Sequence, residues 1–137
     1  MKIRIMMIKD FDEIYTLWKE VGLKIADHKT EEEEVKKMIT LNPMTNFVVC
    51  DGMKIIGTVF GIFNGRRAWI HHLAVHPAFQ NMGIGSLLLK KVEQALKIVG
   101  AERVCLWVDK INLKVLFFYK KYGYREMKNA ICLRKNL

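Results

Sequence analysis

The sequence predicts one domain of the mixed α/β class, in which most strands are antiparallel and one pair is parallel. Two patterns indicate this fold. Asp-Gly and Asn-Gly dipeptides, at residues 51–52 and 64–65, separate β-rich runs, and both dipeptides are strong hairpin signals. A helix-patterned segment, residues 83–99, lies between two apolar strand-like runs, which makes a strand-helix-strand unit with parallel strands. The 137 residues suffice for a single domain, residues 1–137, with a core of its own.

The N-terminal segment predicts a strand followed by a helix. Polar and apolar residues alternate over residues 2–6, as in a strand with one solvent-facing side. An apolar stripe at helical spacing covers residues 11–21. Asp10 and Glu13 have the spacing of a capping box, so we expect the helix to begin there.

Residues 22–30 are too irregular to assign, and loops of this kind often carry function. A second helix is predicted from Thr30, with Glu33 completing a second capping box. The acidic run at residues 31–34 suits the positive end of the helix dipole, which is a full structural explanation. Attraction of a cationic acceptor is the alternative explanation of that run.

Three β-rich runs, residues 47–50, 53–63 and 67–75, predict an antiparallel meander joined by the two hairpin turns. Gly57 and Gly61 fall inside the middle strand. A glycine within a strand indicates a bulge or the close approach of another group.

The C-terminal part predicts alternating helices and strands. The helix over residues 83–99 precedes a strand at residues 104–108, which is apolar throughout and therefore predicted to be buried on both faces. A short helix is expected over residues 111–122. Residues 124–126 and 130–134 predict a final pair of strands.

The net charge of +9 favours anionic partners. Nucleic acid is one candidate and a polyphosphate cofactor is another. The lysines are scattered along the chain and do not form a tract with interleaved aromatic residues, which argues against nucleic acid. A polyphosphate cofactor accounts for only part of the excess charge.

No apolar run approaches the ~18 residues of a membrane span, and the N-terminus lacks the apolar core of a signal peptide. We therefore expect a soluble cytoplasmic protein without a membrane partner. The three cysteines, Cys50, Cys105 and Cys132, are odd in number and lack Cys-x-x-Cys spacing. Buried reduced thiols are expected, with no metal and no disulfide.

The segment from Leu73 to Leu89 has the pattern of a strand end, a loop with two glycines and the first turn of an amphipathic helix. Gly83 and Gly85 let the backbone approach a ligand closely. The free N–H groups and the dipole of the helix start favour an anion at the same place. A tight turn without a ligand would explain the glycines equally well.

The residues on either side of the glycines distinguish a phosphate-binding loop from a tight turn without a ligand. Val-His-Pro at residues 75–77, followed by Gln-x-x-Gly-x-Gly from Gln80 to Gly85 and Ser-Leu-Leu-Leu, resembles the pyrophosphate loop of the GNAT superfamily of acetyl-CoA-dependent N-acetyltransferases. The predicted element order also matches that fold. The resemblance implies a sheet with helices on both faces and a splayed parallel pair, residues 67–75 and 104–108.

In that family the pantetheine arm of acetyl-CoA lies in the gap between the splayed strands, where strand N–H groups bind it. The resemblance therefore implies acetyl-CoA as co-substrate, without a metal. The residues expected to bind it are Leu73, Ala74 and Val75 on the strand, Gln80, Asn81, Met82, Gly83, Ile84, Gly85 and Ser86 in the loop, and Asn112 and Tyr119 further on.

Tyr119 is the expected proton donor. Asn112, then Tyr119 and Lys-Lys-Tyr-Gly-Tyr, is similar to the family's Asn…Phe-Tyr-x-x-x-Gly-Phe segment. In the family this tyrosine faces the coenzyme sulfur and the asparagine binds the pantetheine side. A tyrosine packed beside Phe117 and Phe118 in the core is the structural alternative.

His71 is the expected base. Family members use a histidine or a glutamate on this strand to lead the amine proton away, and no glutamate occurs between Arg67 and Val75. Strand alternation should send His71 and His72 to opposite faces. A histidine buried in the core, or water as the base, is the alternative. His76, beside Pro77, is expected to be structural.

The sequence thus predicts an N-acetyltransferase acting on a primary amine of a small molecule or of a protein N-terminus or lysine. The alternative is a catalytically silent module that binds acyl-CoA and uses it for sensing. The acceptor is not specified by the sequence, and a homodimer is a possible assembly.

Overall fold

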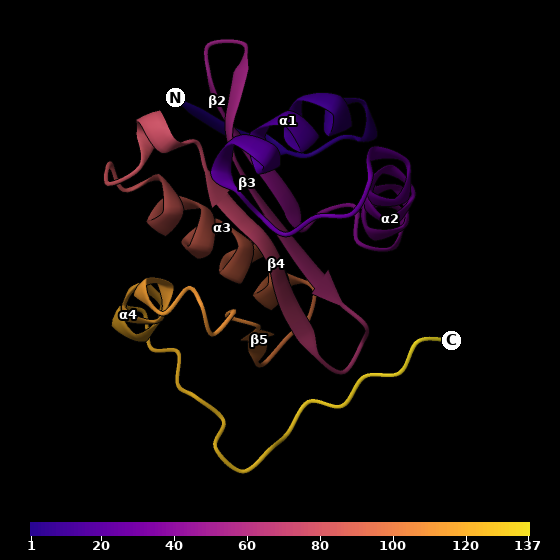
Figure 1. Cartoon of the computed structure of the whole chain (residues 1–137), viewed down its shortest axis with the longest axis vertical. Helices are drawn as coiled ribbons and strands as arrows, with labels where there is room; N and C mark the ends of the chain where they lie inside the picture. Colours follow the sequence, from indigo (N-terminus) through magenta and orange to yellow (C-terminus); the bar gives the residue numbers. More distant parts are fainter. The chain divides into compact units, whose positions relative to one another are not determined.

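The computed structural model describes residues 1–137, which form two compact units, residues 1–106 (the sheet unit) and residues 107–137 (the C-terminal unit). The sheet unit contains five strands in the order β1-β2-β3-β4-β5 (Figure 1). Every neighbouring pair is antiparallel except β4 and β5, which are parallel. This confirms the predicted fold class. The strands are β1 Lys2–Ile5, β2 Asn46–Asp51, β3 Lys54–Phe63, β4 Ala68–Val75 and β5 Val104–Leu106.

Helices lie on both faces of this sheet: α1 (Phe11–Val21) and α2 (His28–Leu41) on one, and α3 (Ile84–Ile98) on the other (Figure 1). Alternation along β3 separates the two faces. Thr58 accepts a hydrogen bond from the Trp18 indole of α1 at 3.1 Å, and the Phe60 ring contacts the same indole, so Thr58 and Phe60 face α1. The glycines at the odd positions face α3.

Gly57 and Gly61 allow α3 to pack directly on the backbone of β3. A Cβ atom at Gly61 would lie 2.5 Å from the Val92 Cγ2 atom of α3. A Cβ atom at Gly57 would lie 3.0 Å from Leu88 of the same helix. A register shift also occurs beside Gly57, in the pairing of β2 with β3. Both expectations for a glycine inside a strand, bulge and close approach, are confirmed.

The predicted capping box at the start of α1 is wrong. Asp10 makes two hydrogen bonds of 2.8 and 3.0 Å with the Arg4 guanidinium and accepts none from the first turn of α1. Glu13 accepts the backbone N–H of Ile55 on β3. A bidentate pair with a guanidinium joins two opposite charges through two hydrogen bonds, so the Asp10 carboxylate links β1 to the start of α1.

The second predicted capping box is also wrong, because α2 begins earlier than Thr30. Asp27 is the N-cap, and its carboxylate accepts the Thr30 N–H at 3.1 Å. The helix therefore starts at His28, inside the segment that the sequence left unassigned. Glu31 turns inward, whereas Glu33 is exposed.

Strand β5 is shorter and less buried than expected. It ends at Leu106, and its three residues are only partly buried, where the sequence predicted a strand over residues 104–108 buried on both faces. The sheet offers β5 a neighbour on one side only, β4, so it is an edge strand.

In the C-terminal unit, α4 (Lys114–Lys121) forms as predicted, but the expected strands at residues 124–126 and 130–134 do not. Neither segment has a ladder partner, and an isolated pair of strands is only marginally stable in water. All cysteines are free, as expected. Cys50 is buried and Cys105 partly buried, but Cys132 is exposed, so the burial predicted for it is wrong. None of the helices has the length and apolar character needed to span a bilayer.

Candidate functional site

The N-terminus of α3 directs the backbone N–H groups of its first turn outward, along the helix axis. Gly83 is the N-cap, with a left-handed φ of 83°, and no side chain caps the helix. The first bond of the helix runs from the Leu87 N–H to the Gly83 carbonyl at 3.0 Å, so the amide hydrogens of the preceding turn project from its end. A Cβ atom at Gly83 would meet no atom within 4 Å, so the approach to these donors is open. The helix dipole adds positive potential at this end.

The loop before α3 is held in place by its own side chains. Gln80 donates a hydrogen bond from Nε2 to the Val75 carbonyl at 3.0 Å, which ties the loop to the end of β4. His76 accepts the Ala78 N–H at 3.1 Å through Nδ1, and its Nε2 lies 3.0 Å from a Glu20 carboxylate oxygen. His76 therefore links the loop to α1, in the structural role expected for it.

Next to this loop, one edge of strand β4 has no partner strand. Its pairing with β5 ends at Ile70, although β4 continues to residue 75. The His76 amide bonds to β3 at 2.8 Å, and amide direction alternates along a strand. The N–H groups of Leu73 and Val75 therefore point away from β3, toward the edge that no strand of the sheet pairs. Ala74 is buried against the α1 side.

The two histidines of β4 do not lie on opposite faces, and this expectation was wrong. His71 pairs with Phe60, and Ala74 pairs with Thr58, so β4 carries one extra residue in between. His72 takes up this bulge with a φ of 49°, unusual for a residue other than glycine. Residues directly opposite in a ladder share a face, so His71 lies on the Phe60 side, which is the face of α1.

His72 lies on the same face because its ring stacks on the Trp18 indole of α1, with centroids 4.4 Å apart. The Thr58 hydroxyl accepts the indole N–H and donates to the His72 carbonyl at 2.9 Å, which fixes the bulge. The Nδ1 atom of His72 is buried and has no hydrogen-bond partner. Burial lowers the pKa of His72, and the negative charge of Glu31 on α2 partly opposes that shift.

The His71 side chain is partly buried and makes no hydrogen bond or ion pair. Burial lowers its pKa below the ordinary 6.5, so the imidazole is neutral at pH 7. A neutral imidazole with an unused nitrogen can accept a proton.

Glu31 was not predicted as an individual site residue; the sequence indicated only the acidic run that contains it. Its exposed fraction is only 5%, although its neighbours on α2 include exposed glutamates. One carboxylate oxygen accepts the Ala26 N–H at 2.9 Å. The other oxygen is buried without a partner. The acidic run was visible in the sequence, but nothing in it marked Glu31 as the member that turns inward.

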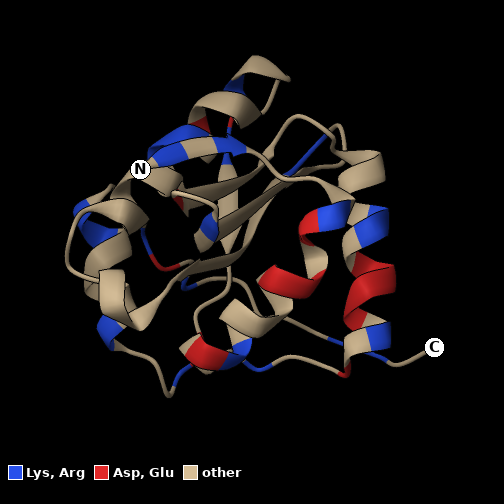
Figure 2. Cartoon of the chain, turned by 90° about the horizontal axis from the view of Figure 1, so that it is seen from above, with Lys and Arg blue, Asp and Glu red and all other residues tan.

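The region around Glu31 is acidic, unlike the rest of the chain. Residues 10–34 contain nine of the 14 acidic residues and only three of the 23 basic residues. Figure 2 shows the acidic positions gathered on helices and the basic positions spread over the chain. The N-terminal helices therefore favour a cation, whereas the remainder favours an anion.

The remaining predicted residues belong to the C-terminal unit. Tyr119 is buried, and its ring contacts those of Phe118 and Tyr124 at centroid distances of 5.2 and 5.5 Å. Burial raises the pKa of Tyr119 to about 12, so the phenol is protonated at neutral pH. Asn112 is exposed just before α4, and its carbonyl accepts the Val115 N–H at 3.2 Å.

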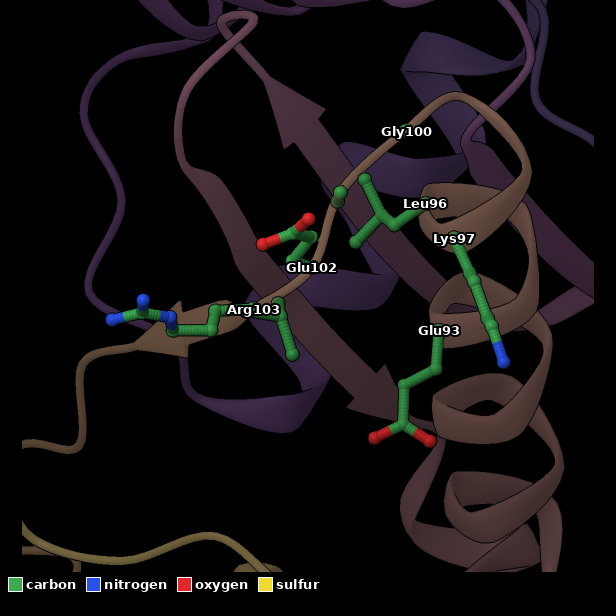
Figure 3. Close-up of a pocket in the computed structure, with 8 residues that line it drawn as sticks. Glu93, Leu96, Lys97, Gly100, Glu102 and Arg103 are labelled. Atoms are coloured by element: carbon green, nitrogen blue, oxygen red, sulfur yellow. The ribbon is translucent and has the colours of Figure 1, made fainter.

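A hollow of about 610 Å³ lies at the C-terminal end of α3, away from the Gly83 loop (Figure 3). Its charged side chains are of both signs, Glu93, Lys97, Glu102 and Arg103, which does not suit a polyanion.

Asp12, His28 and Glu32 bring three ligand atoms within 4.8 Å of one another. The first two are exposed, and His28 already pairs with Asp12 at 2.8 Å. Exposed groups of this kind are common without an ion, so we assign no metal to them.

Known proteins share the fold described above. The family model described as acetyltransferase (GNAT) family matches residues 8–124. The fold is similar to that of ribosomal-protein-S18-alanine N-acetyltransferase from Escherichia coli, with 20% identity and a TM-score of 0.80, covering 93% of this chain and 79% of that one.

Two further solved structures share the fold. Aminoglycoside 6'-N-acetyltransferase from Acinetobacter haemolyticus has 13% identity and a TM-score of 0.81, with 100% of this chain and 99% of that one covered. An acetyltransferase from Clostridium acetobutylicum, solved with acetyl-CoA, has 18% identity and a TM-score of 0.78, with 97% and 95% covered. At these identities the similarity establishes the fold alone.

Proposed function

Because the chain belongs to the GNAT acetyltransferase family, we propose that it transfers an acetyl group from acetyl-CoA to a primary amine. The observation that carries this proposal is the open N-terminus of α3 beside the uncovered edge of β4. A pyrophosphate needs several N–H donors and positive potential, which the helix start supplies. A pantetheine arm carries amides, and amides can pair with the Leu73 and Val75 N–H groups of the free strand edge.

The residues present therefore fit acetyl-CoA. Left-handed φ values at Asn81 and Gly83 shape the loop that would hold the phosphates. Backbone, and not side chains, makes most of this site. Bound acetyl-CoA supplies the thioester whose carbonyl accepts the amine. A strand N–H near Val75 would stabilise negative charge on the thioester oxygen, and loss of one such donor typically costs ~10²–10³ in rate.

The chemistry of His71 on β4 suits an amine as the acceptor. A primary alkylammonium has a pKa of ~10.4 and must lose a proton before it can attack a carbonyl. His71 is neutral at pH 7 and has an unused nitrogen, so we assign it as the proton acceptor. The named activities of two structural neighbours, toward an alanine of a ribosomal protein and toward an aminoglycoside, also involve amines.

Tyr119 is assigned as the proton donor to the departing thiolate. Its raised pKa, about 12, keeps the proton on the phenol at neutral pH but makes the group a weak acid. Transfer of this proton to a thiolate with an ordinary thiol pKa of ~8.5 is uphill. It is favoured where the thiolate is poorly solvated or where the proton moves as the carbon–sulfur bond breaks.

Thermal denaturation with acetyl-CoA tests the co-substrate. At a hundredfold excess over Kd, a ligand specific for the folded state stabilises it by ~2.7 kcal/mol, which should raise Tm measurably. Free CoA should raise Tm as well, whereas acetate should not. Absence of a shift at millimolar acetyl-CoA would remove the cofactor and the proposed reaction together.

A panel of small amines, peptides with free N-termini and lysine peptides, assayed with acetyl-CoA and detection of free thiol, tests turnover. We expect at least one class to be acetylated. Binding of acetyl-CoA without turnover on any acceptor would favour the sensing function that the sequence left open.

A further inference from the structure

We propose that Thr58 is a positioning residue for acetyl transfer, because its hydroxyl holds the bulge that aims the Leu73 and Val75 N–H groups at the free edge of β4. The inference rests on the proposed function, since that edge is where the thioester of acetyl-CoA would lie. Thr58 itself touches no substrate and acts through the backbone of β4.

The backbone of β4 has a regular alternation before the bulge. At the β3–β4 hairpin the Asn64 N–H donates to the Arg67 carbonyl at 3.1 Å, so Arg67 directs its polar groups to β3. Because this direction alternates along an antiparallel strand, the odd-numbered residues up to His71 bond to β3 and the even-numbered ones point away from it.

Beyond the bulge the alternation is reversed. The His76 N–H donates to a β3 carbonyl at 2.8 Å, so here the even-numbered residues direct their polar groups to β3. A strand without the extra residue would continue the first alternation and turn the Leu73 and Val75 N–H groups into the ladder. The bulge is therefore what frees both donors for a ligand at the edge.

Thr58 fixes the backbone at the bulge itself. Its hydroxyl donates a hydrogen bond to the His72 carbonyl at 2.9 Å. The extra residue of a bulge is left out of the ladder, so a side-chain bond of this kind takes the place of a ladder bond. His72 also has a left-handed φ of 49°, a strained conformation that persists only where the surrounding structure holds it.

The Trp18 indole determines which way the Thr58 hydroxyl points. The indole N–H donates to the Thr58 oxygen at 3.1 Å, and both side chains are fully buried. An indole N–H can only donate, so the hydroxyl uses its own proton elsewhere, and the His72 carbonyl receives it. The Trp18 ring also stacks on the His72 ring, with centroids 4.4 Å apart. Helix α1 therefore holds the bulge through both its backbone and its side chain.

NMR tests whether the hydroxyl holds the bulge, without acetyl-CoA. Thr58→Val keeps the shape of the side chain and removes the hydroxyl, whereas Thr58→Ser keeps the hydroxyl. The ring C–H signals of His72, assigned by their loss in His72→Gln, are shifted by the stacked Trp18 ring. We expect these signals to move toward those of an unstacked histidine in Thr58→Val and to stay in place in Thr58→Ser. Unmoved His72 signals in Thr58→Val would overturn the proposal.

Steady-state kinetics, on an acceptor that the wild-type protein uses, test whether the bulge matters for the reaction. In Thr58→Val we expect kcat to fall by about 10- to 100-fold, because a misplaced donor costs less than the ~10²–10³ typical of a lost one. The KM for acetyl-CoA should change little, since the donor acts on charge that develops in the transition state. Thr58→Ser should restore kcat. A wild-type kcat in Thr58→Val would contradict the positioning role.

Thr45→Val is the matched control. Thr45 is also buried, and its hydroxyl donates to the carbonyl of Gly61 at 2.5 Å, in the regularly paired part of β3. Loss of this hydroxyl should lower Tm, as in Thr58→Val, while kcat and the His72 signals keep their wild-type values. An equal loss of kcat in both variants would mean that general loosening of the sheet, and not the bulge, lowers activity.

Thermal stabilisation by acetyl-CoA, measured in the same proteins, separates this proposal from the proposed function. It should be retained in every variant, because the phosphates would bind at the Gly83 loop. A wild-type protein with neither stabilisation nor turnover would remove the proposed function and the catalytic role of Thr58 together. A wild-type protein that binds and turns over, beside a fully active Thr58→Val, would remove the role of Thr58 alone.

Discussion

The Gly83 loop offers backbone groups to a ligand, whereas the face of β4 that carries His71 and His72 offers side-chain atoms. The loop consists of contiguous residues, and its donors exist in any helix that starts there. The histidine positions depend on a bulge in β4 that brings His72 to the face of α1. A site made of backbone should be disrupted by adding a Cβ atom, and a site made of side chains by deleting a single polar atom.

Deleting one oxygen gives the largest expected effect, at Tyr119. Tyr119→Phe keeps the ring contacts with Phe118 and Tyr124 and removes only the hydroxyl. We expect kcat to fall by ~10²–10⁴ with the KM for acetyl-CoA nearly constant, because the proton is donated only in the transition state. Steady-state kinetics on an acceptor that the wild-type protein uses will measure this. Full activity of the variant would make Tyr119 a packing residue.

Adding a side chain at Gly83 should abolish the stabilisation by acetyl-CoA, a loss of ~2.7 kcal/mol at a hundredfold excess over Kd. Gly83→Val places atoms in the open approach to the helix start. Gly65→Val is the matched control, since Gly65 has a similar φ of 92° and open space around it, but lies in the β3–β4 hairpin.

Both glycine variants should lose stability from backbone strain, and only Gly83→Val should lose the response of Tm to acetyl-CoA. A normal response in Gly83→Val would place the phosphates elsewhere.

Substitution of His71 on β4 should give a smaller effect on activity, and one that depends on pH. His71→Gln should lower kcat/KM by about 10- to 100-fold at low pH, where few amines are already neutral, and by less at high pH. The control is His28→Gln, an exposed histidine of α2. His72→Gln cannot serve as an opposite-face control, because the bulge puts both residues on the face of α1. A pH profile parallel to that of the wild type would leave water as the base.

The smallest effect concerns stability. Burial lowers the pKa of both His71 and His72 below the ordinary 6.5, so the unfolded state binds more protons as the pH falls through 6.5. The free energy of unfolding should therefore be constant above about pH 7 and decrease as the pH falls toward 5.

Urea denaturation at a series of pH values will show this decrease. The decrease should be shallower in His72→Phe, where the buried titrating group is absent. An equal slope in that variant would mean that other groups determine the acid sensitivity.

Much of the sheet unit was predictable because its signals are local. Each of these signals specifies a backbone conformation or a close contact through a few neighbouring residues. They are the hairpin dipeptides, the strand runs and the glycines at residues 57 and 61. The Gly83 loop was found for the same reason. The helix over residues 11–21 begins after Asp10 as predicted, but its capping box does not form, because Asp10 and Glu13 bond to Arg4 and Ile55. A capping pattern does not reveal that another partner exists elsewhere in the fold.

The sequence by itself determined the order of elements as far as α4, the two-glycine loop at the start of α3 and the family of the chain. The tertiary structure decided which face His72 occupies and which of four successive glutamates is buried. The physical reason is that both depend on long-range packing. The bulge in β4 is set by its register against β3 and by the contact of His72 with Trp18. Glu31 is buried on α2, which packs against α1, so neither position has a local signal in the sequence.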